Sequence, residues 1–218
     1  MNSTDFSVAR SMMVDSQVRP NKVNDRRILD AMRTIPRENF VPAASAALAY
    51  ADEDVPLGHG RVLIEPMVIA RLVQAAAVEV GERVLVVASG TGYGAALMAA
   101  CGAAVTAVED NKALISIARA ALAGTSVTIF EGPASGGWAS GGPYDVVMLE
   151  GAVEAIPVSL ADQVKPNGGR FIGIHCGDGR TAQAVIGLRV GTSLSLQPLF
   201  DCATPVLPAF RRAAGFVF

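Results

Sequence analysis

A glycine turn that follows a wholly apolar run is the feature that most constrains the fold of this chain. Residues 84–87 are all apolar, and Ser-Gly-Thr-Gly-Tyr-Gly follows at residues 89–94. An apolar run of this length is typical of a strand buried on both faces of a sheet. Glycines directly after it allow positive φ or a close approach of the backbone to a ligand. The segment predicts a strand, a ligand-binding turn and the start of a helix.

An acid at the end of the next apolar run adds a candidate ligand contact. Glu109 ends residues 104–109, nineteen positions after Gly90. A carboxylate at this place can accept hydrogen bonds from both hydroxyls of a ribose. Gly90, Gly92 and Ala95 also fit the loose dinucleotide pattern G-x-G-x-x-G/A. The pattern predicts an adenosine-containing cofactor without choosing among them, and a structural turn with a solvated acid is the alternative.

Strand and helix patterns alternate from residue 83 onward. Strands are predicted at residues 84–87, 104–109, 126–130, 144–149 and 170–175, and helices at residues 95–100, 111–123 and 156–164. Two further alternating segments, residues 181–190 and 193–199, flank a Gly191-Thr192 turn and predict an antiparallel hairpin. The chain should form a mostly parallel α/β sheet with an antiparallel edge and a ligand crevice at the strand ends.

The first part of the chain has mainly helical periodicity. Helices are predicted at residues 6–17, at residues 24–33 with Asn24 as the N-cap, and from Pro66 onward. Residues 42–57 look irregular apart from an Ala-rich turn. We therefore expect a helical, substrate-side extension over residues 1–80.

The α/β core is then expected over residues 81–218, and the two parts should form one compact unit. The last segment, residues 199–218, contains Pro205, Pro208 and the pair Arg211-Arg212. Prolines at this density disfavour a continuing strand or helix. We expect this segment to pack irregularly against the sheet edge.

Composition excludes several classes of function. The net charge is −2 and no cluster of Lys or Arg occurs, so the electrostatic signature of a nucleic-acid binder is absent. Three widely spaced cysteines, Cys101, Cys176 and Cys202, indicate neither a disulfide framework nor a zinc site. We expect no metal, and a reducing, cytoplasmic location.

The sequence predicts neither a membrane span nor an export signal. Residues 84–108 carry no charge, which on length alone would admit a membrane span. Glycines at positions 90, 92, 94 and 102 interrupt it, which favours buried strands and a helix over a span. The first ten residues include an acid and no apolar core, so they do not predict a signal peptide.

Several motifs in chain order resemble those of the protein-L-isoaspartate O-methyltransferase family. The matching segments are MVDSQV at residues 13–18, PRENFVP at residues 36–42, VLVVASGTGY at residues 84–93, PYD at residues 143–145, and IPVSLADQV at residues 156–164 with a Gly-Gly pair at 168–169. The resemblance covers about residues 13–174. It is more specific than the glycine turn, because a dinucleotide dehydrogenase explains none of the N-terminal matches.

The resemblance implies a Rossmann-like class I methyltransferase fold with a seven-stranded sheet. It implies S-adenosylmethionine as cofactor and a damaged protein or peptide as partner. Methyl transfer to the α-carboxylate of an isoaspartyl residue would give an ester that collapses to a succinimide, which is a protein-repair reaction. An ionised carboxylate and an activated methyl need mainly to be held in line, so neither a metal nor an acid–base pair is required.

The resemblance also implies site residues. The cofactor-binding positions are Ala88, Ser89, Gly90, Thr91, Gly92, Tyr93, Glu109, Gly132, Pro133 and Glu150. The substrate-side positions are His59, Gly60 and Val62, and Ile64 stands where the family has its functional serine.

Four departures from the family pattern affect these positions. Ile64 and Val62 replace hydroxyl residues of the substrate loop, and isoleucine cannot hydrogen-bond a carboxylate. In the cofactor loop Val86 replaces a glutamate and Ala88 the first glycine. Pro133 replaces an aspartate that would address the adenine, and proline has no N–H to donate. A methyltransferase for another acceptor and a non-catalytic descendant therefore remain as alternatives.

A few other residues have both a functional and a packing interpretation. Trp138 follows two glycines and could stack on a base or pack within its loop. His175 ends a predicted strand near the substrate side, where it could also simply close the strand. Cys101, at a helix end, is interpreted as a small core residue.

Overall fold

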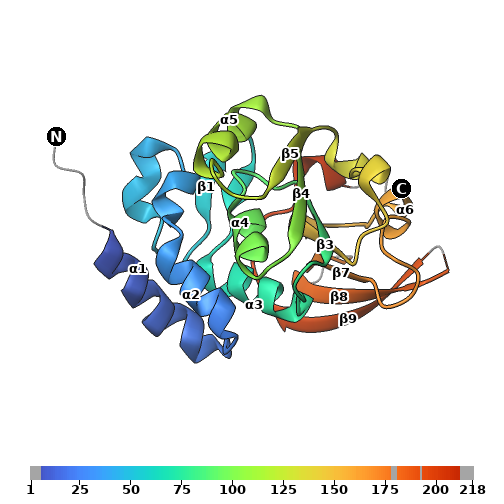
Figure 1. The fold of residues 1–218 in the computed structure, drawn as a ribbon, viewed down its shortest axis with the longest axis horizontal. Coiled ribbons are helices and arrows are strands. Elements are labelled where there is room, and N and C mark those ends of the chain that lie inside the picture. Colours follow the sequence, from blue (N-terminus) through green and yellow to red (C-terminus); the bar gives the residue numbers. More distant parts are fainter. Residues whose placement is uncertain (1–5, 178–180, 192, 212–218) are drawn as a thin grey trace, which may run out of the picture.

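The computed structural model describes residues 6–177, 181–191 and 193–211, and its centre is a seven-stranded sheet (Figure 1). In spatial order the strands are β5 Thr128–Glu131, β4 Ala104–Glu109, β3 Arg83–Val87, β6 Val146–Val153, β7 Arg170–His175, β8 Gln183–Val190 and β9 Ser193–Asp201. The first five strands run parallel, whereas β8 and β9 are antiparallel to their neighbours. The expected mostly parallel sheet with a C-terminal hairpin is confirmed.

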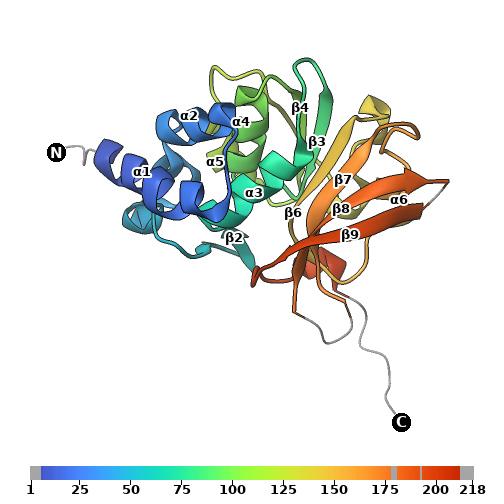
Figure 2. The ribbon, with the colours of Figure 1, turned by 90° about the horizontal axis from the view of Figure 1, so that it is seen from below.

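Both faces of the sheet are covered, as the apolar strands require. Every residue of β6 is buried, and the side chains of β3 alternate between two buried sets. The first set includes residues of α1 Ser7–Met13, α2 Arg26–Thr34, α3 Pro66–Ala76, α4 Tyr93–Ala100 and α5 Lys112–Ala121. The second set includes Leu160 of α6 Val158–Ala161. Figure 2 shows α1, α2 and α3 together on one side of the sheet.

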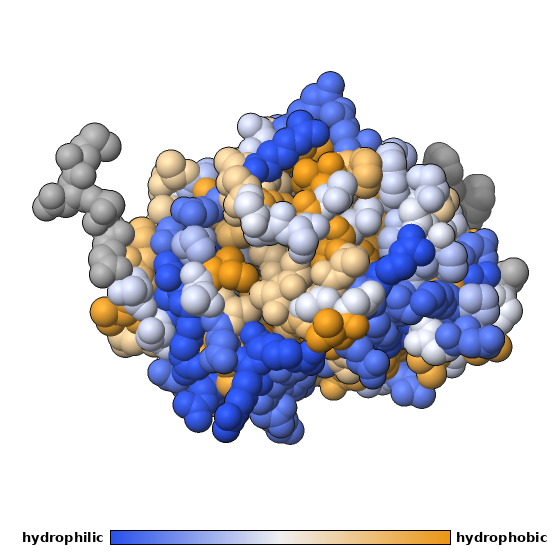
Figure 3. All heavy atoms as spheres, in the orientation of Figure 1, coloured by the Kyte–Doolittle hydropathy of each residue, from blue (hydrophilic) through white to orange (hydrophobic). Residues whose placement is uncertain are grey.

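The helix α2 shows why the N-terminal elements dock where they do. Its residues Ile28, Leu29 and Met32 are buried, whereas Arg26 and Asp30 are exposed. An apolar stripe at this spacing packs one face of the helix on the core. The polar face of this N-terminal region is part of the blue surface at the lower left of Figure 3. One buried set joins residues from both sides of position 80, and the division of the chain at that position stays a prediction.

Several element boundaries differ from the sequence expectations. The N-cap of α2 is Asp25 and not Asn24, because the Asp25 carboxylate accepts the backbone N–H of Arg27 at 2.9 Å. The first helix ends at Met13 and continues as a π-helical segment, Val14–Val18. The helix α6 has only four residues, since Val164 already forms a bridge with Tyr144.

The strands β5 and β6 also start later than expected, and β6 runs on to Val153. The strand β8 begins at Gln183 rather than at residue 181, and β9 continues to Asp201. Of the predicted Gly191-Thr192 turn, Thr192 lies outside the described residues.

A small hairpin corrects the expectation of an irregular segment before residue 58. Strands β1 Val55–Gly58 and β2 Arg61–Leu63 pair antiparallel. They are too short for a clear alternation, and Pro56 and Gly58 are residues that strands usually avoid. The hairpin matters because it carries Arg61 toward the carboxyl ends of the central strands.

The segment after β9 also differs from expectation. It does not follow the sheet edge but returns to the carboxyl end of β6. Val206 forms a parallel bridge with Ala152, and the backbone N–H of Leu207 donates to the carbonyl of Ala152 at 2.8 Å. Residues Pro208–Phe210 form a short 3-10 turn. The rest of the predicted tail, residues 212–218 with Arg212, lies outside the described residues.

Within the described residues, no helix combines the length and apolar character that a membrane crossing requires.

Candidate functional site

The glycine turn between β3 and α4 has the positive φ values that its glycines allow. Gly90 and Gly92 have φ values of +57° and +91°. Ala88, which replaces a family glycine, has φ +52°, a left-handed conformation that costs an alanine roughly 1 kcal/mol or more. The substitution therefore keeps the turn but adds strain and a methyl group to it.

The carboxylate of Glu109 lies directly against this turn. Its Oε2 accepts the backbone N–H of Gly90 at 2.7 Å. Its Oε1 accepts the backbone N–H groups of Asp110 and Asn111, each at 3.1 Å. Glu109 is 0% exposed. The expected proximity of the strand-end acid and the glycine turn is present in the structure.

Arg61 is the fourth group on this carboxylate. Its Nη1 donates to Glu109 Oε1 at 2.8 Å, and its Nη2 donates to the carbonyl of Ala88 at 2.6 Å. The Arg61 side chain is 8% exposed. The guanidinium therefore bridges the end of β4 and the backbone that precedes the glycine turn. This ion pair is buried, and each partner offsets the desolvation of the other.

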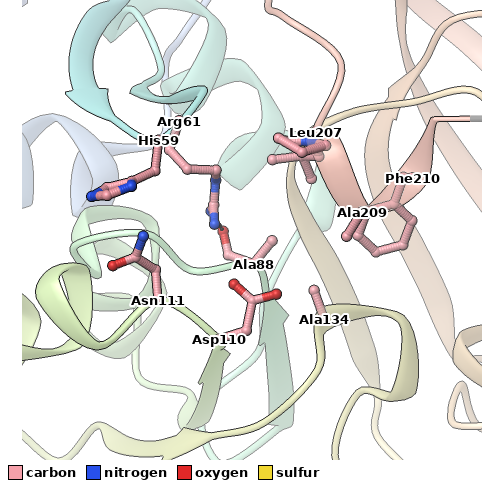
Figure 4. Close-up of a pocket in the computed structure, with 10 residues that line it drawn as sticks. His59, Arg61, Ala88, Asp110, Asn111, Ala134, Leu207, Ala209 and Phe210 are labelled. Atoms are coloured by element: carbon pink, nitrogen blue, oxygen red, sulfur yellow. Dashed lines mark hydrogen bonds between the residues drawn. The ribbon is translucent and has the colours of Figure 1, made fainter.

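A cavity of about 140 Å³ lies beside this ion pair (Figure 4). It is lined by His59, Arg61, Ala88, Asp110, Asn111, Ala134 and residues 207–210. Small-molecule sites are usually about 300–1,000 Å³. The cavity lies at the carboxyl ends of the parallel strands, where ligands of such sheets bind. Its volume is smaller than that of a usual ligand site.

The C-terminal segment forms one wall of the cavity. Leu207 and Phe210 are both buried. The ring of Pro208 lies so close to Gly60 that a Cβ there would be 3.1 Å from its Cγ. The β1–β2 hairpin and the returning C-terminal segment therefore pack together over the cavity.

Four of the predicted cofactor positions serve the core instead of lining the cavity. The hydroxyl of Thr91 donates to the carbonyl of Phe40 at 2.5 Å. Gly92 packs so closely on the C-terminal end of α5 that a Cβ would be 2.8 Å from Leu122, the residue that follows the helix. Tyr93 is 0% exposed and packs edge-on against Phe40, with ring centres 5.2 Å apart. The buried hydroxyl of Ser89 has no hydrogen-bond partner within the described residues.

Glu150, one of the predicted cofactor positions, is buried against Gly94 and is not among the residues that line the cavity. A Cβ on Gly94 would be 2.6 Å from its Oε2, and that oxygen has no hydrogen-bond partner among the described residues. Burial raises the pKa of Glu150 to about 8, although Arg61 and Arg37 act in the opposite direction. The side chain is therefore mostly neutral at neutral pH.

Gly132 and Pro133, two of the predicted cofactor positions, are not among the residues that line the cavity. Gly132 donates its backbone N–H to the carbonyl of Glu109 at 3.0 Å, and Pro133 is exposed. Their neighbour Ala134 lines the cavity. Trp138 stacks on Phe130 with ring centres 4.0 Å apart. In this structure Trp138 therefore packs within its own region, as the second interpretation of this residue expects.

The substrate-side predictions divide into two groups. His59 lines the cavity, and Gly60 beside it contacts the C-terminal segment. Val62 is half-buried and faces Pro56 across the hairpin. Ile64 is 1% exposed and belongs to the hydrophobic core. Ile64 is not among the residues that line the cavity.

Two other candidates lie outside the site. His175 lines a separate cavity of about 220 Å³ between α6 and β9. Cys101 is buried at the end of α4, as a core residue would be. Within the described residues, no group of His, Cys, Asp and Glu side chains is arranged to hold a metal ion.

Sequence reasoning missed Arg61, Asp110, Asn111 and the segment 207–210. The signal for Asp110 and Asn111 was available, since they follow the strand-end acid directly. Arg61 lies between the predicted substrate-side positions Gly60 and Val62, and no local pattern indicates its role. Its pairing with Glu109, 48 positions away, becomes visible only once the hairpin is placed.

Sequence comparison identifies the family. The family model described as protein-L-isoaspartate(D-aspartate) O-methyltransferase matches residues 9–187. The protein-L-isoaspartate O-methyltransferase of Methylorubrum extorquens strain PA1 is 39% identical over 179 residues, which are 81% of this chain and 78% of that protein. A protein-L-isoaspartate O-methyltransferase 1 of Rhodopseudomonas palustris strain HaA2 is 36% identical over 190 residues, covering 86% of this chain and 77% of the relative.

Solved structures agree on the fold. A protein-L-isoaspartate O-methyltransferase superposes with a TM-score of 0.77 at 23% identity, covering 91% of this chain and 65% of that one. A Plasmodium falciparum chain assigned to the same enzyme type, in complex with S-adenosyl-L-homocysteine, gives 0.75 at 18% identity, covering 92% and 98%. The Rossmann-like class I methyltransferase fold is confirmed. The motifs, the sheet and the match over residues 9–187 lead to one conclusion: this chain belongs to the protein-L-isoaspartate(D-aspartate) O-methyltransferase family.

Proposed function

We propose that this chain transfers a methyl group from S-adenosylmethionine to the α-carboxylate of L-isoaspartyl residues in damaged proteins or peptides. One observation carries the proposal: the buried Glu109 carboxylate contacts the glycine turn, with Gly90 N and Glu109 Oε2 2.7 Å apart. At the carboxyl ends of parallel strands, this pairing suits an adenosine-containing cofactor. Family membership narrows that class to S-adenosylmethionine.

The chemistry asks for positioning more than for proton transfer. The cofactor supplies a methyl group that its sulfonium already activates. An isoaspartyl carboxylate is ionised at neutral pH, so it needs no general base. The task of the chain is to hold the acceptor in line and to exclude water. His59 and Arg61 line the cavity as the basic residues that can face an anionic acceptor.

The residue types at the site suit an adenosyl group, but the Arg61 side chain occupies part of the space that the group would need. A carboxylate at the end of β4 can accept hydrogen bonds from a ribose, and Asp110, Asn111 and Ala134 line the adjoining space. The cavity of about 140 Å³ is nevertheless smaller than a usual ligand site. Arg61, which lies on Glu109 and Ala88, fills the space between them.

The proposal extends to partners and location. A protein or peptide is the expected partner rather than a nucleic acid or a membrane, because the net charge is −2 and no basic cluster is present in the sequence. We place the protein in the cytoplasm, where the buried thiols of Cys101 and Cys202 would stay reduced.

The direct test is a methylation assay. Purified protein is incubated with methyl-labelled S-adenosylmethionine and a peptide that contains one isoaspartyl residue. The same peptide with an ordinary aspartyl residue is the control. We expect base-labile methyl ester on the isoaspartyl peptide alone. An equal, background level of label on both peptides would exclude the proposed acceptor.

A second candidate function is methyl transfer to another carboxylate or hydroxyl acceptor. The observation in its favour is Ile64, which is 1% exposed and offers no hydroxyl where the family has a serine. This alternative predicts that S-adenosylhomocysteine binds while isoaspartyl peptides stay unmethylated. A non-catalytic descendant predicts that S-adenosylhomocysteine does not bind at all. Calorimetry with S-adenosylhomocysteine beside the methylation assay separates all three.

A further inference from the structure

Arg61 occupies the acceptor that a ribose would need. Four donors reach the Glu109 carboxylate among the described residues: Arg61 Nη1 and the backbone N–H groups of Gly90, Asp110 and Asn111. A carboxylate offers about four lone-pair sites. Three of these donors, Arg61 among them, share Oε1, and only the Gly90 N–H reaches Oε2. Oε1 is therefore crowded, and a ribose that uses both carboxylate oxygens has to displace a donor from it.

Only one of these four donors can leave without remodelling the fold. The N–H groups of Gly90, Asp110 and Asn111 belong to the glycine turn and to the start of α5. Arg61 is a long side chain on a short hairpin, and rotation about its own bonds can withdraw it. The guanidinium is also incompletely satisfied, because its buried Nε has no hydrogen-bond partner within the described residues.

Arg61 also blocks the path along the turn. A Cβ built on Gly90 would lie 3.8 Å from Arg61 Nη2 and 3.6 Å from Leu57. The glycines of such a turn serve to let a ligand approach the backbone closely. Here the guanidinium makes that approach instead. Figure 4 shows the side chain extending from the hairpin to Ala88 along one wall of the cavity.

We propose that Arg61 competes with the ribose hydroxyls of the cofactor for Glu109, so that cofactor binds only when the guanidinium withdraws. This inference rests on the proposed function, since it takes the ligand to be an adenosyl compound. Withdrawal removes from Glu109 Oε1 the only charged donor among the described residues, frees the carbonyl of Ala88 from the guanidinium, and enlarges the cavity at the same place. Arg61 thereby sets the affinity of the site for its cofactor.

The test measures binding of S-adenosylhomocysteine by calorimetry. The Arg61→Leu variant removes the competitor and keeps an apolar stem, so we expect its Kd to fall at least tenfold below that of the unchanged chain. The matched control is Arg189→Leu. Arg189 bonds the carbonyls of Asp162 and Val164 and is not among the residues that line the cavity. Its Kd should equal that of the unchanged chain.

A double-variant cycle then asks whether Glu109 is the shared acceptor. In a Glu109→Gln background the tenfold gain from Arg61→Leu should disappear, because the contested carboxylate is gone. A gain that persists there would overturn competition for Glu109 and leave only a steric effect. Should Arg61→Leu fail to fold by circular dichroism, Arg61→Gln, which removes the charge, gives the same comparison.

The failures of the two proposals are distinguishable. If the unchanged chain binds S-adenosylhomocysteine and Arg61→Leu binds it no more tightly, the competition is refuted and the proposed function stands. If neither binds at millimolar concentration, the proposed function fails and the competition with it. Tighter binding by Arg61→Leu that depends on Glu109 supports both.

Discussion

The guanidinium of Arg37 lies over the ring of Tyr93, 4.7 Å from the ring centre, and both side chains are fully buried. Arg37 also donates from Nε to the carbonyl of Ala49 at 2.7 Å and from Nη2 to the carbonyl of Ile64 at 2.6 Å. Tyr93 is the first residue of α4 and follows the glycine turn directly. Arg37 thereby fixes the irregular N-terminal segments to the element that would carry the cofactor.

Replacing Arg37 with methionine keeps a long side chain and removes its donors. We expect the free energy of unfolding to fall by about 3 kcal/mol, because two buried carbonyls lose their partner at about 1–3 kcal/mol each. Urea denaturation measures the change. Arg33→Met on α2, where the side chain is 33% exposed, should cost less than about 1 kcal/mol. An equally small loss for Arg37→Met would mean that the carbonyls find other donors.

Removal of Arg61 should weaken the free chain even though it strengthens cofactor binding. Arg61→Leu leaves the 0% exposed Glu109 carboxylate without a cation, and breaking a buried ion pair in this way costs about 3 kcal/mol. Thermal denaturation with and without S-adenosylhomocysteine measures this loss of stability. The ligand should raise the melting temperature of the variant by more than that of the unchanged chain.

Lys112→Leu is the control for this prediction, because Lys112 pairs with Glu131 at the surface, at 3.5 Å. Its effect should stay below about 1 kcal/mol. An Arg61→Leu variant as stable as the Lys112→Leu variant would show that the three backbone N–H groups alone hold the Glu109 carboxylate.

The parts of this molecule that sequence could predict are those with local causes. Residues 104–109 and 170–175 were expected as strands and form β4 and β7 with the same bounds, because apolar runs between turn residues carry their own signal. The contact between the glycine turn and Glu109 followed from the strand–turn–helix pattern, since adjacent parallel strands end at the same edge.

The parts that sequence could not predict depend on distant contacts. Arg61 reaches Glu109 through a hairpin whose strands have four and three residues, too few for a periodic signal. Leu207 lines the cavity because the chain turns back after β9 to pair with Ala152, and no local pattern announces that return. Ile64 is similar: the family resemblance implies a site position there, and no local pattern indicates that this side chain is 1% exposed.

Glu150 should make stability depend on pH. Its pKa is raised from 4.5 to about 8 by burial, so the folded chain holds a proton that the unfolded chain releases above pH 4.5. Glu150 does not lower the free energy of unfolding below pH 4.5. The free energy of unfolding falls as pH rises from 4.5 toward 8, and above pH 8 Glu150 causes no further change. A shift of this size corresponds to a few kcal/mol.

The Glu150→Gln variant tests this dependence, because glutamine is similar in size and cannot ionise. We expect the two proteins to be about equally stable at pH 4.5, and the variant to be more stable by a few kcal/mol at pH 8.5. Urea denaturation across this range measures the difference. Glu131→Gln, at a side chain that is 49% exposed, serves as control. A difference that does not grow with pH would mean that Glu150 is ionised in the folded chain.

The contact between Gly151 and Leu207 should hold the C-terminal segment over the cavity. Gly151 has φ +151°, and a Cβ there would lie 2.6–2.8 Å from three side-chain atoms of Leu207. Gly151→Ala should therefore cost more than Gly168→Ala, since Gly168 has φ +77° but nothing within 4 Å of a Cβ. We expect about 1 kcal/mol for the control, from backbone strain alone, and about 3 kcal/mol for Gly151→Ala.

The cause of the extra cost can be separated by adding Leu207→Ala, which removes the atoms that the new methyl would meet. The two substitutions should then be less destabilising together than the sum of their separate effects, by more than about 1 kcal/mol. Additive effects would show that Gly151 is needed for its backbone conformation only. A strong coupling would show that β6 fixes Leu207, and through Leu207 the wall of the cavity that an adenosyl cofactor must share.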